Sequence, residues 1–366
     1  MKFIHTADLH LGKFVCGVSQ LPYQEEALNE MLQYATTYHI PAIVIAGDIY
    51  DRSIPNVDAV ELFNRFLIQC NSYNIAVLCI SGNHDSEGRL NFGTTFFSHN
   101  QVYIVSKLEE TMPYVDIEDT RFYFLPFAKP NTFKLFDLEL PSLSYNLAME
   151  RYMAKQSIDT TKNTVLITHH FIAGSLIESE SEQPLMVGGT DQIDAHLFDQ
   201  FDYVALGHLH APQKVGRESM RYSGSPLRYS FDECKQHKSF TIVEIINHQV
   251  TIQLEEFRPS KTLKVLKGSF SSLLEGKDDH FIAFELTDHA LIPNAMDQLK
   301  EKYPNAMQLS YVDLNEEEVE SKSLENIQSL DDLTLFKEFY KGIRNQELEE
   351  NEIKIIQDLL SGGEEE

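Results

Sequence analysis

The sequence predicts an α/β protein: a two-sheet sandwich flanked by helices, then a small α+β domain and a C-terminal helix pair. Two observations carry this prediction. Across residues 1–210, short apolar segments alternate with amphipathic ones, which is the pattern of parallel strands joined by helices. Across residues 214–257, short β runs follow one another with only turn residues between them. A sandwich with helices on its outer faces accommodates both patterns.

The helical segments show apolar residues at intervals of three and four positions. Residues 22–39 have this spacing from Ala27 to Ala35, and residues 57–70 and 142–157 predict two more helices. Residues 89–98 predict a short helix or loop, in which we expect Phe96 and Phe97 to belong to the core. Strands are expected at 2–6, 42–46, 76–80, 102–105, 121–125, 165–167, 203–206, 221–223, 240–246 and 249–257.

Composition changes divide the rest of the chain. Arg258-Pro259-Ser260 interrupts the β pattern, and strands at 263–266, 281–286 and 307–312 follow it. An acidic, polar stretch then precedes Ser329, which with Asp332 three residues later matches a capping box. We therefore expect a main domain of residues 1–258, an α+β capping domain of 259–314, an acidic linker of 315–328 and a helix-loop-helix segment of 329–361.

Overall composition sets limits on location and partners. The 366 residues have ordinary globular composition, with no apolar run of membrane-spanning length and no signal peptide, so the cytoplasm is the default. The four cysteines have no paired spacing, which indicates neither a disulfide framework nor a zinc ribbon. A net charge of −26 argues against nucleic acid, but eight carboxylates gather in the last 20 residues, and bound divalent metals would add positive charge at a site.

Five predicted strands end in residues that bind metal ions. Parallel strands place such residues together at their carboxyl ends. A Gly-Asp pair at one strand end is more often an ordinary turn, so the weight lies in the ordered set. The motifs are Asp8-Leu9-His10, Gly47-Asp48 with Asp51, Gly82-Asn83-His84-Asp85, His169-His170 and Gly207-His208-Leu209-His210.

These residue types suit a pair of metal ions. Two divalent ions that share a ligand need a bridging carboxylate, and each also needs neutral ligands that leave positions open for water and substrate. Asn83 offers a neutral oxygen that does not repel a phosphate. Asp8 and His10 lie two positions apart, hence on the same side if the backbone stays extended.

The motifs resemble those of the calcineurin-like metallophosphoesterases: D-x-H, G-D-x-x-D, G-N-H-D/E, an H motif and G-H-x-H, all in order from Asp8 to His210. Within that superfamily, the stretches MKFIHTADLHLGK, GDIYDR and YSGSPLRYSFDE are similar to the SbcD family of bacterial nuclease subunits. The resemblance implies a four-layer fold and a two-metal nuclease that cleaves double-strand DNA ends and hairpins with an SbcC-type ATPase in repair and recombination.

The resemblance also implies roles for single residues. One metal, most often manganese in this family, would be held by Asp8, His10, Asp48 and His210, and the other by Asp48, Asn83, His169 and His208. His84 would face the scissile phosphate, and Asp51 occupies the position that orients it in related phosphatases, although relatives of SbcD from archaea and eukaryotes tend to have histidine there. Spacing alone does not separate His169 from His170; the register to Gly174 favours His169.

Partners are expected on two surfaces. Apolar stripes in 329–361 would bind the base of the SbcC coiled coil, or else pack on each other as a hairpin. Helices 22–39 and 57–70 are candidate faces for a homodimer within a heterotetramer, or else are buried in the monomer. A phosphatase or phosphodiesterase acting on proteins or small nucleotides is the alternative function, and a non-catalytic scaffold is a third hypothesis that the intact ligand set disfavours.

Overall fold

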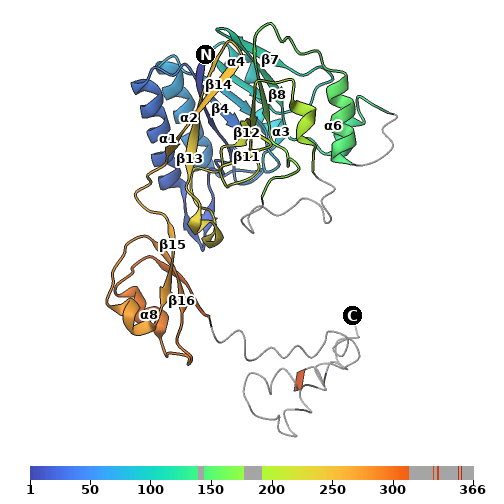
Figure 1. Ribbon diagram of the computed structural model, residues 1–366. Helices are drawn as coiled ribbons and strands as arrows, with labels where there is room; N and C mark the ends of the chain where they lie inside the picture. Colours follow the sequence, from blue (N-terminus) through green and yellow to red (C-terminus); the bar gives the residue numbers. More distant parts are fainter. Residues whose placement is uncertain are drawn as a thin grey trace.

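The computed structural model describes residues 1–138, 144–176 and 192–312, with five single positions beyond them. The predicted linker and helix-loop-helix segment therefore lie almost wholly outside the described residues. The described strands form two six-stranded sheets, a separate three-stranded sheet and a two-stranded hairpin (Figure 1). Among the described residues, no helix combines the length and the apolar character needed to cross a membrane.

The first sheet has the strand order β14-β13-β1-β4-β5-β6. Strands β1, β4, β5 and β6 are parallel to one another, whereas β13 pairs antiparallel with both β1 and β14. The central strands are buried on both faces, which explains their unbroken apolar sequences. The bounds are β1 (Lys2–Thr6), β4 (Ala42–Ala46), β5 (Ala76–Ile80), β6 (Val102–Val105), β13 (Ser239–Ile246) and β14 (Gln249–Glu256).

The second sheet has the order β11-β12-β10-β9-β8-β7. Its four central strands are parallel, and each edge strand pairs antiparallel with its neighbour. The carboxyl ends of β9 and β10 therefore lie side by side. The bounds are β7 (Tyr114–Ile117), β8 (Thr120–Leu125), β9 (Asn163–Thr168), β10 (Tyr203–Leu206), β11 (Gln213–Val215) and β12 (Arg217–Tyr222).

The two sheets pack face to face and carry helices on their outer faces (Figure 1). Phe3 and Val44 of the first sheet share the inner core with Phe122 and Tyr203 of the second. Helices α1 (Leu21–Thr37) and α2 (Val57–Ser72) cover the first sheet, and α6 (Tyr145–Ala154) covers the second. The buried face of α1 contains the apolar residues that predicted it. The predicted four-layer sandwich is confirmed.

The segment after β5 differs from the prediction. It forms two short helices, α3 (Glu87–Leu90) and α4 (Thr94–Ser98), before the edge strand β6. Phe96 is 78% exposed and Phe97 37%, so their expected place in the core is wrong. The reason is length: α4 has a little more than one turn and lies against an edge strand, so it can bury only one side.

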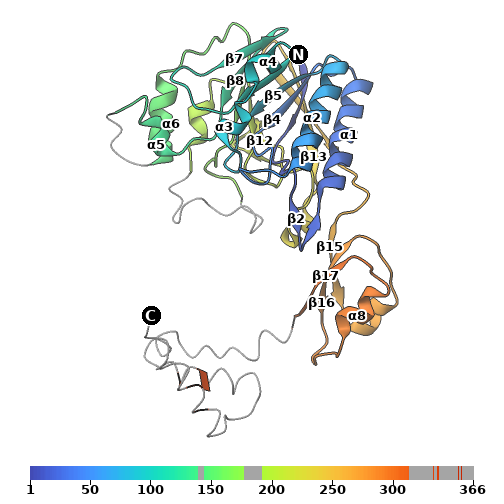
Figure 2. The same ribbon diagram turned by 180° about the vertical axis from the view of Figure 1, so that it is seen from behind.

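The third sheet follows the β13–β14 hairpin. Its parallel strands β15 (Leu263–Gly268), β16 (Phe281–Leu286) and β17 (Ala306–Tyr311) enclose a small core with α7 (Phe270–Leu274) and α8 (Ala295–Lys300). It meets the sandwich next to the hairpin β2 (Phe14–Val15) and β3 (Val18–Ser19) (Figure 2). A 3₁₀ helix, η3 (Phe231–Lys235), packs there, and Arg228 donates to the carbonyls of Gln236 and Leu263.

Candidate metal centre

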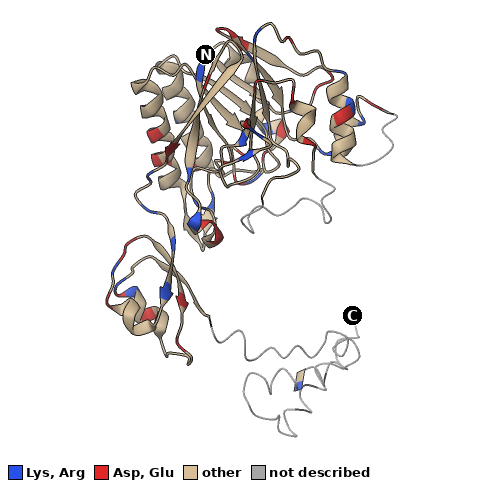
Figure 3. Ribbon diagram, viewed as in Figure 1, with Lys and Arg blue, Asp and Glu red and all other residues tan. Residues whose placement is uncertain are grey.

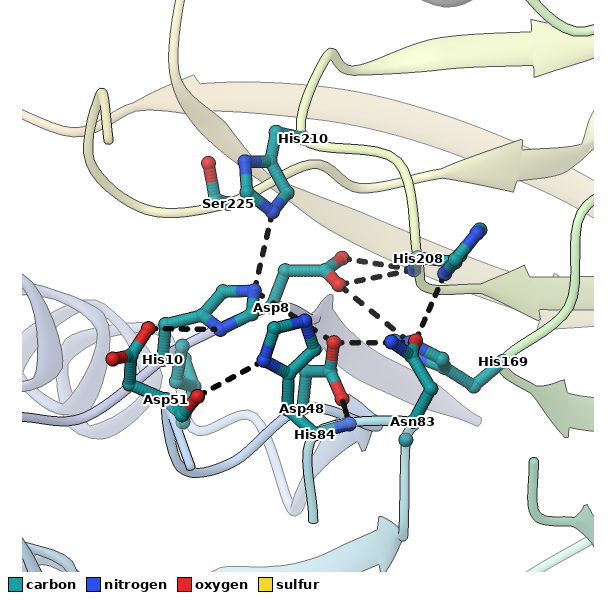
Figure 4. A network of polar contacts seen from close by, with 12 residues as sticks. Asp8, His10, Asp48, Asp51, Asn83, His84, His169, His208, His210 and Ser225 are labelled. Carbon is teal, nitrogen blue, oxygen red and sulfur yellow. Dashed lines mark hydrogen bonds and ion pairs between the residues drawn. The ribbon is translucent and has the colours of Figure 1, made fainter. Parts of the chain in front are cut away.

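The predicted site residues converge where the carboxyl ends of the parallel strands of both sheets meet (Figure 4). The first sheet supplies residues after β1, β4 and β5, and the second sheet supplies residues after β9 and β10. The structure thus brings together, from five strand ends, Asp8, His10, Asp48, Asp51, Asn83, His84, His169, His208 and His210.

The backbone at these strand ends is not extended. Asp8, His10 and Asp48 have φ values of 52°, 43° and 47°, and His208 has φ 110°. The expectation that Asp8 and His10 share a side of an extended strand is therefore wrong in its reason, although both side chains reach the site. Main-chain bonds hold this conformation, because the amides of Asp8 and His10 donate to the carbonyls of Gly47 and Asp48 at 3.1 and 3.0 Å.

Two glycines are required by close approaches around the site. A Cβ at Gly82 would lie 2.1 Å from an Asp48 carboxylate oxygen, and one at Gly207 would lie 1.9 Å from the carbonyl oxygen of Ala46. Both distances are far below any contact that real Cβ atoms make. The Gly-Asn-His and Gly-His-x-His motifs therefore contain glycine so that the strand ends can pack against each other.

The ligand atoms form two groups that meet at Asp48. On one side, His10 Nε2 lies 3.7 Å from Asp48 Oδ2 and 3.1 Å from His210 Nε2. On the other, His169 Nε2 lies 3.3 Å from the same Asp48 oxygen. Asn83 Oδ1 completes the second group, 3.1 Å from His169 Nε2 and 3.0 Å from His208 Nδ1. Ring nitrogens that point at one another and at carboxylates fit bound cations.

The side chains also form groups that fit bound cations. Asp8, His10 and His210 place one ligand atom each within 4.8 Å of one another, as do Asp8, Asp48 and His169. These clusters and the fold support divalent metal ions as cofactors of this chain.

Burial controls the charge of the site. It raises the pKa of Asp8 to about 7 and lowers the pKa of His208 to about 3, which keeps that imidazole in the neutral form that binds metals. Burial opposes ionisation at Asp48 and His169 too, but their mutual attraction outweighs it. It holds the pKa of Asp48 below its usual range and raises that of His169 to about 9. Uptake of a cation must therefore displace protons.

His169, rather than His170, belongs to the site. Ala46 O lies 2.7 Å from His169 Nδ1 and accepts its proton, which leaves Nε2 directed at Asp48. His170 instead pairs with the Thr168 hydroxyl at 2.9 Å and stacks on Phe127. The ring of His169 is thus directed at Asp48, whereas the ring of His170 turns into the core of its own sheet.

His84 and Asp51 meet in an unexpected way. His84 Nδ1 lies 2.9 Å from the main-chain carbonyl oxygen of Asp51, whereas the Asp51 carboxylate lies 3.0 Å from Lys13 Nζ and 3.8 Å from His10 Nδ1. Asp51 therefore contacts His84 through its backbone. A carbonyl fixes the ring orientation as a carboxylate would, without adding negative charge beside the imidazole.

Two supporting carboxylates surround the site. Asp85 accepts hydrogen bonds from the amides of Ile49, Tyr50 and Gly82, which agrees with the interpretation that it holds the loop. Glu233, which belongs to none of the predicted metal-binding motifs, is fully buried and lies 2.9 Å from His210 Nδ1. It lies in the stretch YSFDE, where no periodicity separates a buried glutamate from a solvated one.

Two family models match parts of this chain. Residues 1–212 match the family model of calcineurin-like phosphoesterases, and residues 259–343 match a model described as the type 5 capsule protein repressor C-terminal domain. A crystal structure of a dimetal phosphatase from Danio rerio is 11% identical, with a TM-score of 0.44, and covers 71% of this chain and 97% of that one.

Two curated relatives match over nearly their full length. The chain is 35% identical to the SbcD subunit of the nuclease SbcCD from Staphylococcus saprophyticus, over 99% of this chain and 98% of that protein. It is equally similar to the protein of the same name from Staphylococcus epidermidis, with the same coverage. The chain therefore belongs to the calcineurin-like phosphoesterases and, within them, to the SbcD family of metal-dependent nuclease subunits.

Proposed function

We propose that this nuclease uses two metal ions to hydrolyse DNA phosphodiester bonds at double-strand ends and hairpins, together with an SbcC-type ATPase in repair and recombination. The observation that carries the proposal is the place of Asp48 between two groups of ligands, 3.7 Å from His10 Nε2 and 3.3 Å from His169 Nε2. A carboxylate in that position suits a shared ligand of two ions.

We assign the ligands by these contacts. Asp8, His10, Asp48 and His210 would hold one ion, and Asp48, Asn83, His169 and His208 the other. The donors are carboxylate oxygens, an amide oxygen and imidazole nitrogens, with no thiolate. This mixture suits Mn²⁺, the metal that we propose.

The chain's own residues position and protonate the substrate. When bound, two divalent ions would stabilise charge on the phosphoryl oxygens and provide a nucleophile at neutral pH. The Asp51 carbonyl accepts a hydrogen bond from His84 Nδ1–H, which leaves Nε2 for the phosphate. In its protonated form that ring stabilises the transition state or gives a proton to the leaving oxygen.

A groove beside the centre favours a polymeric substrate over a small nucleotide. It has a volume of about 250 Å³ and shares Asp51 with the centre. Its walls include Phe14 and Ile54, which are 52% and 69% exposed, and the exposed Arg52. On such a surface, a base can stack on the aromatic ring and a phosphate can pair with the cation.

The acidic charge of the chain supports a partner. Residues 313–366 contain 17 acidic and 5 basic residues, whereas the described parts carry both signs interspersed (Figure 3). We propose that 329–361 forms the helix-loop-helix segment that binds the SbcC coiled coil, and that SbcC supplies much of the basic DNA-binding surface. The domain division that goes with this proposal is a nuclease domain of residues 1–258, a capping domain of 259–314 and a linker of 315–328. We also propose that the protein is cytoplasmic.

A homodimer within a heterotetramer is supported by exposed apolar side chains on neighbouring helices. Val57, Val60 and Ile68 of α2 are 71%, 42% and 60% exposed, and Phe96 of α4 is 78% exposed. The ends of these helices are close, because the Asn71 side chain at the end of α2 donates to the carbonyl of Asn100, just beyond α4. Exposed apolar residues gathered in this way suit a two-fold interface.

A nuclease assay tests the proposal. We expect the purified chain with Mn²⁺ to cleave linear and hairpin DNA, and an SbcC-type partner with ATP to increase cleavage. Truncation after Asn326 should leave hydrolysis of a small phosphodiester unchanged while removing SbcC binding and ATP-stimulated cleavage. Cleavage of phosphoproteins or cyclic nucleotides, with DNA left intact under all conditions, would instead identify a phosphatase or phosphodiesterase. Full SbcC affinity in the truncated chain would show that SbcC binds outside the removed segment.

Light scattering tests the dimer separately. We expect Ile68→Glu to shift the protein towards a monomer, because a charge would be buried at the interface. Gln69→Glu, on the next residue of α2 in the sequence, is the control. A strict monomer for the wild-type chain at micromolar concentration would contradict the dimer.

A further inference from the structure

We propose that Glu233 is a positioning residue that holds the imidazole of His210 in the orientation needed to bind metal. This inference rests on the proposed role of His210 as a ligand. Glu233 lies on η3 and is fully buried, and its Oε1 is 2.9 Å from His210 Nδ1. A buried carboxylate at this distance accepts a hydrogen bond from Nδ1–H, which leaves the lone pair of Nε2 for a cation.

The other carboxylate oxygen is fixed as well. Glu233 Oε2 accepts a hydrogen bond from the amide of Tyr229 at 3.0 Å and lies 2.8 Å from Lys238 Nζ. The Lys238 ammonium, itself 7% exposed, donates to the main-chain carbonyl of His210 at 2.9 Å. One buried ion pair therefore contacts both the ring and the backbone of His210.

His210 differs in this respect from His169 and His84. Those two histidines direct Nδ1 at main-chain carbonyls, those of Ala46 and Asp51. A carbonyl fixes the orientation of a ring, whereas a carboxylate also places a negative charge beside it, which favours a cation bound to the other ring nitrogen. Glu233 therefore strengthens His210 as a ligand. Its loss should weaken the ion held with Asp8 and His10 more than the ion held with Asn83.

Metal binding by the full-length chain tests the role of Glu233. Mn²⁺ alone is titrated into metal-free protein and followed by calorimetry and by the electron paramagnetic resonance of free Mn²⁺. We expect Glu233→Gln to weaken one of the two ions about 10- to 100-fold, the usual effect of losing such a partner. Asp232→Asn is the matched control, because it removes an exposed carboxylate from the adjacent position of η3 and should bind Mn²⁺ as the wild type does.

Two readouts separate positioning from general stability. Excess Mn²⁺ should restore the activity of Glu233→Gln towards the wild-type value, and ¹⁵N chemical shifts of His210 in metal-free protein should show a change of tautomer. The double variant E233Q/K238M removes the buried ammonium together with its carboxylate, so it can fold even if the single variant does not. Either variant with wild-type Mn²⁺ affinity and an unchanged His210 tautomer would overturn the inference.

A third variant distinguishes this inference from the ligand assignment. His210→Ala should lose one Mn²⁺ ion. If it kept both ions at wild-type affinity, the ligand role of His210 would fall, and the role of Glu233 with it. If His210→Ala lost an ion while Glu233→Gln bound both ions normally, the ligand role would stand and only the positioning role would fall.

Discussion

The two sheets of the sandwich contribute different chemistry to the same centre. The first sheet supplies the carboxylates of Asp8 and Asp48 and the amide of Asn83, from residues after three adjacent parallel strands. The second sheet supplies His169, His208 and His210, all of them imidazoles. The proposed anionic ligands thus come from one layer, together with the imidazole of His10, while the other layer contributes imidazoles alone.

This difference shows how the centre is assembled. No metal group proposed above can form from one sheet alone, because each needs carboxylate from the first and imidazole from the second. His208 is kept neutral because burial lowers its pKa, whereas Asp48 raises the pKa of His169. The carboxylates would balance the charge of the cations. Asp48 would contribute to both ions because it adjoins both groups. Substitutions in the two sheets should therefore differ in how strongly they affect activity and metal binding.

The largest effect is expected at the shared carboxylate of the first sheet. Asp48→Asn removes the anion between the two groups and should abolish activity and weaken both ions, because an amide cannot bridge two cations as a carboxylate does. Elemental analysis of the purified variant gives the number of ions per chain. Two tightly held ions with full activity would show that the carboxylate is not shared.

His84, also from the first sheet, should separate chemistry from metal binding. We expect His84→Gln to keep its fold and both ions but to lose cleavage of a phosphodiester by about 100-fold or more, because it removes a proton donor beside the phosphate. Measurement of kcat together with metal content distinguishes a role in chemistry from a role in metal binding. Loss of an ion from this variant would make His84 a ligand.

The second sheet allows a matched pair of substitutions. His169→Gln should weaken the ion held with Asn83 and leave the ion held with His10, because His169 belongs to one group only. His170→Gln is the neighbouring control, and its ring faces Thr168 and Phe127 instead of the centre. Mn²⁺ titration of both variants compares them directly. Equal loss of metal from the two would contradict the division into two groups.

The smallest effect expected is the contribution of Asp8 to the pH dependence of metal affinity. The pKa of Asp8 is raised to about 7 by burial, so this proposed ligand carries a proton in the metal-free protein at lower pH. That proton should lower Mn²⁺ affinity about tenfold as pH falls from 8 to 6, and His169, whose pKa Asp48 raises to about 9, should lower it further, because ligands must lose protons to bind. Calorimetry at both pH values measures it; an affinity independent of pH would remove Asp8 from the ligands.

The same pKa shifts affect the stability of the metal-free protein in the opposite direction to metal affinity. The raised pKa of His169 contributes stability that is complete below its unfolded pKa of 6.5 and is lost as pH rises through about 9. The raised pKa of Asp8 means that the folded state binds more protons than the unfolded state between about 4 and 7, so it too loses stability as pH rises through that window. Both effects favour the metal-free fold at low pH and metal binding at high pH.

Sequence reasoning predicted the sandwich and the set of residues at the centre because both depend on patterns along the chain. Buried parallel strands read as apolar runs, and their carboxyl ends bring the motif residues together whatever the detailed conformation. The left-handed backbone at Asp8 and His10 was not predictable, because it depends on carbonyl groups of another strand end. The exposure of Phe96 and the buried state of Glu233 depend likewise on what neighbouring segments cover.

The left-handed backbone at the centre has a consequence for protein engineering. His10 and Asp48 have φ values of 43° and 47°, in a region that costs non-glycine residues free energy of order 1–3 kcal/mol. Substitution of His10 by glycine would relieve such strain while removing a proposed ligand. A directed-evolution screen for thermal tolerance run in chelator would therefore select against His10 and Asp48. The same screen run with Mn²⁺ would retain these two proposed ligands.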